Sequence, residues 1–126
     1  LPAEVVVRAE GTNDGATNIV AAMTAVLNGV IAACPGKKIA VLRPFSGGQA
    51  ANLQSAIAAC SNPSLCTYVD TTGFFNTAYG ADSINLHPAG PNNLGRIAPL
   101  IAAQLRPLLV SGAAPALRST SSFPVW

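Results

Sequence analysis

The strand and helix signals alternate three times along this chain, and that alternation constrains its fold more than any other feature. Short β-branched or apolar runs are each followed by turn residues and then by apolar residues at helical spacing. The pattern predicts strands at residues 5–8, 39–42 and 67–69, with helices at about residues 19–34, 49–60 and 92–110. Three such units in series form a parallel sheet with helices packed on its faces, joined by right-handed crossovers. We therefore expect an α/β fold.

Two segments lie outside this periodic pattern. Residues 70–91 read as a long polar loop, and residues 111–126, rich in Ser, Ala and Pro, read as an irregular tail. Pro99 and Pro107 fall within the last predicted helix and should bend it, because proline interrupts the helical hydrogen bonds. The predicted α/β domain therefore spans residues 1–110, and the tail follows it.

The composition is that of one globular domain. The chain has 126 residues, of which 50% are hydrophobic and 10% charged, so most of its length can be buried. The formal net charge is only +2 and the basic residues are scattered, which gives nucleic-acid binding little support. Asn28, Gly29 and Gln104 interrupt the most apolar stretches, so we expect no membrane-spanning helix.

The start of the chain and its cysteines suggest a processed, secreted protein. Leu1 is followed almost directly by a strand pattern, without an initiator methionine or a signal-peptide core. The odd number of cysteines, the few charges and the many small residues suit an extracellular protein. Cys60 and Cys66 flank a turn-rich segment and are candidates to close a small disulfide loop, which would leave Cys34 for an outside partner. The alternative is three reduced, buried thiols.

Three strands are few for a parallel sheet. Such sheets are normally covered on both faces and grow outward from a buried centre. A version with only three strands would expose an apolar edge, of the kind formed by residues 5–7 or 39–41. Additional strands from outside this chain would cover that edge.

The polar motifs of the chain all follow strands. Gly11-Thr12-Asn13-Asp14 follows the first, Ser46-Gly47-Gly48 the second, and the segment from Asp82 to His87 the third. Ligand sites in open α/β sheets lie beyond the carboxyl ends of the strands, so these loops are expected to share one site. An Asn in such a loop can offer its side-chain amide to an oxyanion. An Asx turn or a helix cap is the plainer explanation of Asn13, and a backbone-bridging loop residue that of His87.

With Gly11-Thr12-Asn13-Asp14 and the run His87-Pro88-Ala89-Gly90 before an apolar helix, the chain resembles the SGNH (GDSL-type) hydrolases over about residues 3–110. One sequence block of that family is Gly-x-Asn-Asp, and its last block places a catalytic His before the final helix. The resemblance implies a three-layer α/β/α, flavodoxin-like fold, of which this chain is the carboxyl-terminal part. It also implies that Asn13 donates to the oxyanion, that Gly11 and Asp14 shape the loop, and that His87 is the general base.

The chain departs from the family pattern at the acidic partner of the histidine. The family places an Asp three residues before the His, but residue 84 is Ile, and the nearest acid is Asp82, five residues before His87. Asp82 is the candidate third catalytic residue if the loop folds back. Asn85 or a backbone carbonyl are the alternative partners of the imidazole.

A second departure concerns the nucleophile. The family's Gly-Asp-Ser block and its second oxyanion Gly are not found in this sequence, and none of its serines lies in a Gly-x-Ser-x-Gly elbow. The resemblance therefore implies a companion amino-terminal polypeptide, from a cleaved precursor whose two chains stay associated, that supplies the serine. Cleavage in an exposed connection costs little once the fold is made.

Together these features predict a secreted esterase subunit. It would hydrolyse carboxylic esters through an acyl-enzyme, and analogy favours acetyl esters of carbohydrate, with Phe74, Phe75 and Tyr79 as residues that could stack on a sugar. We expect no metal or organic cofactor, because one His and separated cysteines give no ligand cluster. The alternatives are a peptide or thioester hydrolase of the same fold, or a non-catalytic α/β module that self-associates.

Overall fold

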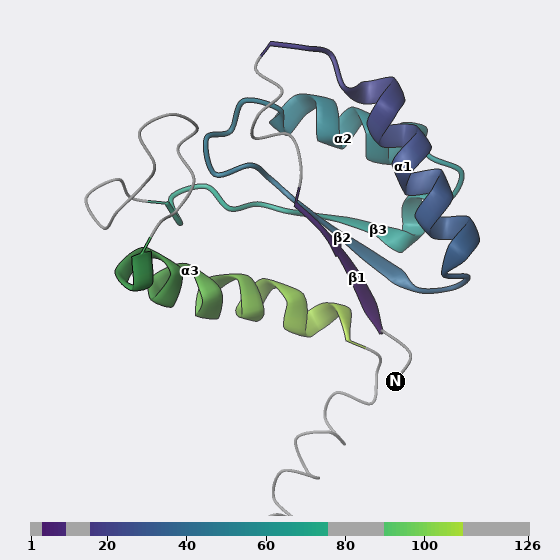
Figure 1. Cartoon of the computed structure of the whole chain (residues 1–126). Coiled ribbons are helices and arrows are strands. Elements are labelled where there is room, and N and C mark those ends of the chain that lie inside the picture. The colour runs from purple at the N-terminus through teal and green to yellow at the C-terminus, as the bar shows by residue number, and fades with distance from the viewer. Residues whose placement is uncertain (1–3, 10–15, 76–89, 110–126) are drawn as a thin grey trace, which may run out of the picture.

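The computed structural model describes residues 4–9, 16–75 and 90–109. In these ranges the chain alternates strands and helices (Figure 1). The elements, in chain order, are β1 (Val5–Arg8), α1 (Val20–Ala33), β2 (Lys38–Leu42), α2 (Ala50–Ala59), the 3-10 turn η1 (Pro63–Leu65), β3 (Cys66–Val69), α3 (Gly90–Leu105) and the 3-10 turn η3 (Arg106–Leu108). The predicted α/β fold with about three βα units is confirmed.

The three strands form one parallel sheet in the order β1-β2-β3. Val6 pairs with Ile39 on one side of β2, and Val41 pairs with Tyr68 on the other. The central strand β2 is buried from Ile39 to its end. A strand that is buried on both faces of a sheet carries apolar side chains on both, which explains the unbroken apolar run of β2.

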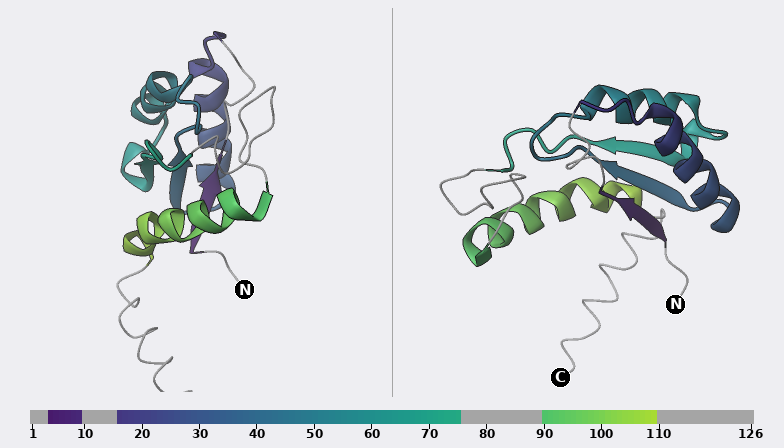
Figure 2. Two further views of the ribbon diagram at one scale, coloured as in Figure 1. Left: turned by 90° about the vertical axis from the view of Figure 1, so that its left-hand side faces the viewer. Right: turned by 45° about the horizontal axis from the view of Figure 1, so that its top comes forward.

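Helices cover the two faces of the sheet unequally. Side chains alternate along a strand, so Ile39 and Val41 of β2 point to one face and pack with Leu27 of α1 and Leu53 of α2. Ala40 and Leu42 form a second cluster with Val69, against which Ile101, Leu105 and Leu108 pack. Figure 2 shows α1 and α2 on one side of the sheet and α3 on the other. The result is a three-layer α/β/α arrangement.

A polar residue in the middle of α1 connects the two helices of one layer. Asn28 Oδ1 accepts a 2.7 Å hydrogen bond from the backbone N–H of Ser61, just beyond the end of α2. The interaction explains why an Asn interrupts an otherwise apolar helix, because it satisfies a backbone donor where α2 has ended. None of the helices in the described ranges is long and apolar enough to cross a membrane.

The last helix differs from its predicted bounds. It begins at Gly90 rather than residue 92, and it ends at Leu105, where η3 takes over. Pro91 is tolerated because the first turn of a helix needs no N–H donors. Pro107 ends the α-helix, because its ring would clash with the carbonyl four residues earlier, and it sits in the first turn of η3. The predicted interruption at Pro107 is therefore observed, but the α-helix ends there in a 3-10 turn instead of continuing, whereas Pro99 lies inside α3. The predicted tail lies outside the described residues.

The outer edge of β1 is exposed. Among the described residues no strand pairs with β1 on the side away from β2. Val7, in the middle of β1, is 46% exposed, although β-branched residues of parallel sheets are usually buried. The open apolar edge expected of a three-stranded sheet is thus observed at β1.

Candidate active site

The three strands end side by side, at what we call the carboxyl edge of the sheet. Arg8, the last residue of β1, pairs with Val41, and Leu42, the last residue of β2, pairs with Val69 at the end of β3. In Figures 1 and 2, α3 also begins on this side. Every loop that follows a strand therefore starts from the same edge, as the sequence predicts.

The five predicted site residues lie in two segments outside the described residues. Gly11, Asn13 and Asp14 belong to residues 10–15, which directly follow Ala9 at the end of β1. Asp82 and His87 belong to residues 76–89, between Phe75 and the start of α3. Their positions and roles remain predictions, but the residues at both ends of each segment are described.

A buried amide connects the first of these segments to α2. Gln49, only 2% exposed, donates from Nε2 to the backbone carbonyl of Thr17 over 3.0 Å. Its Oε1 accepts a 2.6 Å hydrogen bond from the side chain of Asn52, one turn further along. Thr17 lies two positions beyond residue 15. Gln49 therefore holds the end of the loop that contains Asn13 against the amino terminus of α2.

A buried hydroxyl connects the loops after β2 and β3. Thr71, 1% exposed, donates from Oγ1 to the carbonyl of Arg43 over 2.8 Å. The backbone N–H of Arg43 donates in turn to the carbonyl of Val69 over 3.0 Å. These bonds extend the pairing of β2 and β3 beyond the last strand residues, so the start of the loop that leads to His87 is fixed to the central strand.

The side chain of Arg43 packs against its own loop and is largely shielded from solvent. Its side chain is 19% exposed, and Nη1 donates to the carbonyl of Pro44 at 3.3 Å. Gly47 has a left-handed backbone, with φ of 81°, and a Cβ at this position would clash with Nη2 of Arg43. The backbone conformation favours glycine here, and a larger residue would in addition displace the end of the Arg43 side chain.

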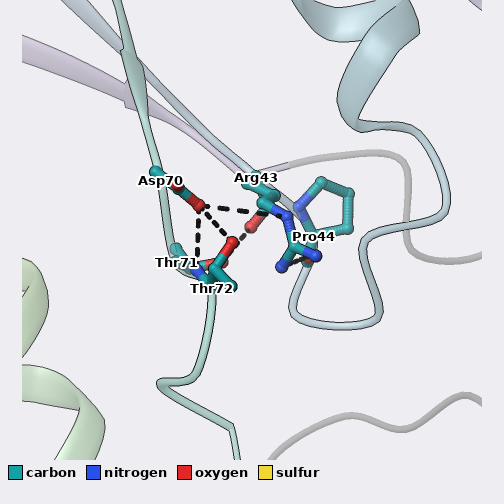
Figure 3. Close-up of polar contacts among 5 residues, drawn as sticks. All are labelled: Arg43, Pro44, Asp70, Thr71 and Thr72. Carbon is teal, nitrogen blue, oxygen red and sulfur yellow. Dashed lines mark hydrogen bonds and ion pairs between the residues drawn. The ribbon is translucent and has the colours of Figure 1, made fainter.

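Asp70 faces Arg43 across the carboxyl edge (Figure 3). Its Oδ1 accepts hydrogen bonds from the backbone N–H of Thr72 at 2.9 Å and from the Thr72 hydroxyl at 2.5 Å, and lies 4.0 Å from Nε of Arg43. The Thr72 hydroxyl, then the Thr72 N–H and the Arg43 charge lower the pKa of the Asp70 carboxyl. Asp70 is thus an ionised residue that shapes an Asx turn at the edge.

One aromatic residue considered for sugar stacking packs against another loop. Phe75 lies with its ring centroid 6.3 Å from that of Phe45, at an interplanar angle of 33°. Both rings are half-buried, and such tilted pairs contribute to packing between loops. Phe75 therefore braces the loops after β2 and β3, whereas Tyr79 lies outside the described residues.

The loops after β2 and β3 are joined to each other where they leave the sheet, and the loop after β1 is attached to the start of α2 near its far end, at Thr17. No family model, curated protein or solved structure matches this chain. The features that bear on function are the motifs and the geometry of the carboxyl edge. Within the described ranges, no three His, Cys, Asp or Glu side chains gather as a metal site would require. An open hollow lined by Ala102, Leu105, Arg106 and Leu109 lies at the other end of α3.

Sequence reasoning had not identified Gln49, Arg43, Asp70 and Thr71 as functionally relevant. A usable signal existed for the last three, because Arg43 and Asp70 are the first residues after two neighbouring parallel strands and Thr71 follows at once. The role of Gln49 had no such signal, since its partner Thr17 is 32 positions away in the sequence.

Proposed function

We propose that this chain is part of a serine esterase whose active site lies at the carboxyl edge of the sheet. In this proposal Asn13 donates its amide to the oxyanion, Gly11 and Asp14 shape that loop, and His87 is the general base. A companion amino-terminal polypeptide of a cleaved precursor supplies the nucleophilic serine. The reaction is hydrolysis of a carboxylic ester through an acyl-enzyme.

The observation that carries the proposal is the relative position of the ends of β1 and β3. They flank the end of β2 in one parallel sheet. Neighbouring strands lie about 4.8 Å apart, so roughly 10 Å separates the starting points of the two motif-bearing loops. Side chains on two loops that begin this close together can reach one substrate carbonyl, whereas loops at opposite ends of the sheet could not.

The chemistry of the two residues suits this reaction. An amide donor held in place before the reaction stabilises the charge that develops on the carbonyl oxygen, and loss of one such donor costs about 10²–10³ in kcat. A histidine titrates near neutral pH, so it can take the serine proton and return it to the leaving alcohol. Gln49 and Thr71 support the proposal indirectly, because they attach the loops from which these side chains extend to neighbouring elements.

Asp82 is the proposed orienting partner of His87. Asp70 is the only acidic side chain described at the carboxyl edge in residues 43–49 and 70–75, and it is engaged by Thr72 and Arg43. A carboxylate that holds a turn is poorly suited to orient an imidazole as well, which favours Asp82 for that role.

The exposed edge of β1 supports a companion polypeptide. A strand paired with the open side of β1 would extend the sheet beside Val7 and would bring a further loop to the carboxyl edge. A serine on such a loop would lie next to the loop that contains Asn13. We propose a secreted enzyme that acts on acyl esters, with acetylated carbohydrate as the substrate class to test first.

His87→Ala tests the proposal in the protein assembled with any polypeptide that copurifies with it. Turnover of p-nitrophenyl acetate should fall by about 10³-fold or more, with unchanged circular dichroism, because the serine loses its base. Unchanged turnover would remove His87 from the mechanism.

The exposed edge of β1 also favours a second function, that of a non-catalytic module that self-associates there. A stable, inactive oligomer of this chain alone would support it.

A further inference from the structure

Two cysteines meet at the opposite, amino edge of the sheet. Cys60 is the residue that ends α2, and Cys66 is the first residue of β3. Their sulfur atoms lie 3.8 Å apart, and both are free thiols in the structure. This is van der Waals contact, and a disulfide requires the sulfurs to approach further, to about 2.05 Å.

The backbone on either side of this pair is well defined. The N–H of Cys60 bonds to the carbonyl of Ile57, and the next residue, Ser61, is held by Asn28 of α1 at 2.7 Å. Cys66 is paired in the sheet with Ile39 of β2. The thiols are therefore brought together by a helix end and a strand start that are each anchored to the core, and their proximity does not depend on a free loop.

The segment between the two cysteines is compact as well. Leu65 N–H donates to the carbonyl of Asn62 at 3.2 Å, and the Ser64 hydroxyl donates to Asn62 Oδ1 at 2.6 Å. Pro63 begins the single turn of η1. A loop already folded into this turn loses little further freedom in the native state when its ends are joined, so closing it acts mainly on the unfolded chain.

We propose that Cys60 and Cys66 are a dithiol that closes to a disulfide by exchange with a low-molecular-weight disulfide such as oxidised glutathione, and that Cys34 remains a thiol. Cys34 ends α1, and among the described residues the contact between sulfur atoms joins Cys60 and Cys66 only. The disulfide would fasten the end of α2 to the start of β3.

The small disulfide is the only oxidant that this exchange needs. The thiolate of Cys66, the more exposed of the two, attacks the small disulfide, forms a mixed disulfide and releases one thiol, which carries away the proton that Cys66 lost. The thiolate of Cys60 then attacks the sulfur of Cys66, forms the protein disulfide and releases the second thiol with the second proton. The protein loses two electrons and two protons, and the small disulfide is reduced to two thiols.

Burial and the neighbouring Cys60 raise the pKa of the Cys66 thiol from 9.0 to about 12. The thiolate is therefore scarce near neutral pH, and exchange in the native protein should be slow. For this reason the test includes refolding from denaturant in a glutathione redox buffer, where both thiols are accessible before the fold forms.

Tryptic mapping under non-reducing conditions distinguishes the three cysteines. Trypsin cuts after Arg8, Lys37, Lys38 and Arg96, and Pro44 blocks cleavage after Arg43, so Cys34 falls in residues 9–37 and the pair in residues 39–96. After refolding, the peptide of residues 39–96 should be lighter by about 2 Da and resist alkylation, with Cys34 fully alkylated. Two alkylated thiols, a glutathione adduct on the pair, or a bridge that includes Cys34 would overturn the proposal.

Matched serine variants provide a second readout. Closure of this short loop should shift the folding equilibrium by about 50-fold toward the native state, measured as the difference in urea stability with and without a reductant. Cys34→Ser should keep that difference, and Cys60→Ser should lose it. An equal difference in Cys60→Ser, or none in Cys34→Ser, would contradict the pairing. Because the cysteines lie at the amino edge, this outcome is independent of the proposed esterase activity.

Discussion

The buried side-chain amide of Gln49 donates a 3.0 Å hydrogen bond to the backbone carbonyl of Thr17, across 32 positions of sequence. It attaches the loop that precedes α1 to the start of α2. Thr17 lies four positions after Asn13 in the same loop, so this bond attaches to α2 the loop that carries the proposed oxyanion donor. Gln49 is accordingly a positioning residue in the proposed enzyme.

Gln49→Glu tests this bond, because an ionised carboxylate has the same shape and no donor. We expect a loss of about 1–3 kcal/mol in the free energy of unfolding, measured in urea, since the Thr17 carbonyl loses its partner. In the assembled esterase kcat should fall more than KM changes. Gln54→Glu, on the exposed surface of the same helix, is the matched control and should change neither quantity appreciably. Equal effects of the two substitutions would refute the role of Gln49.

Thr71→Val should also destabilise the protein by about 1–3 kcal/mol, because it removes the hydroxyl that bonds to the carbonyl of Arg43 at a position that is 1% exposed. Ser55→Ala, at an exposed position of α2, should stay within about 0.5 kcal/mol. Thermal and urea denaturation of the two variants measure the difference. A Thr71→Val protein as stable as the unmodified one would show that the link between the loops is unimportant.

Gly47→Ala separates backbone strain from the packing of Arg43. Alanine at a left-handed position costs about 1–2 kcal/mol, and Gly36→Ala should cost the same, since Gly36 has φ of 73° and open space around its Cβ position. Only Gly47→Ala should displace the Arg43 guanidinium, which NMR of the Arg43 side chain can follow. In the assembled esterase, we expect lower turnover for Gly47→Ala than for Gly36→Ala, and equal turnover would place Arg43 outside the working site.

The contribution of Asp70 to the stability of the folded state should decrease at low pH. Because hydrogen bonds from Thr72 lower its folded pKa below 3.8, ionised Asp70 favours the folded state above that value. The contribution is lost as the pH falls through the lower, folded value. Thr72→Val should raise the Asp70 pKa more than Arg43→Gln does, as measured by NMR titration of the carboxyl carbon. A larger shift in Arg43→Gln would show that the ion pair dominates.

Asp82→Asn examines the unusual spacing before His87. If Asp82 orients the imidazole, turnover of p-nitrophenyl acetate should fall by about 10³–10⁴-fold, as expected when a triad carboxylate is replaced. Asn85→Ala is the control for the alternative partner and should retain most of the activity. A loss of only a few-fold in Asp82→Asn would assign the orienting role to a backbone carbonyl or another residue.

Much of the fold could be predicted because its signals are local. The apolar run that forms β2 and the helical spacing of Met23 and Leu27 are visible in the sequence, and burial follows from them. The end of α3 was misjudged because the apolar spacing continues through Leu108 and Leu109, whereas Pro107 stops the α-helix at Leu105. Backbone geometry outweighed hydrophobic periodicity at that point.

The candidate site, too, could be predicted from the sequence only in part. Parallel strands bring their carboxyl ends together, so the convergence of the loops after β1, β2 and β3 could be predicted from strand order alone. The contact of Arg43 with Asp70 had a signal, because each residue directly follows one of two neighbouring strands, whereas the contact of Gln49 with Thr17 depends on a tertiary distance that no sequence pattern encodes. The roles proposed for Asn13 and His87 rest on the sequence motifs and on the topology of the sheet.

The central claim is that the carboxyl edge of this sheet is an esterase site completed by a serine from outside these 126 residues. Labelling the native assembly with a fluorophosphonate, followed by mass mapping of every polypeptide present, tests it most directly. We expect one phosphonylated serine, in a Gly-Asp-Ser segment outside residues 1–126, and loss of that labelling in His87→Ala. A label on a serine within residues 1–126, or an assembly that neither labels nor hydrolyses esters, would contradict it.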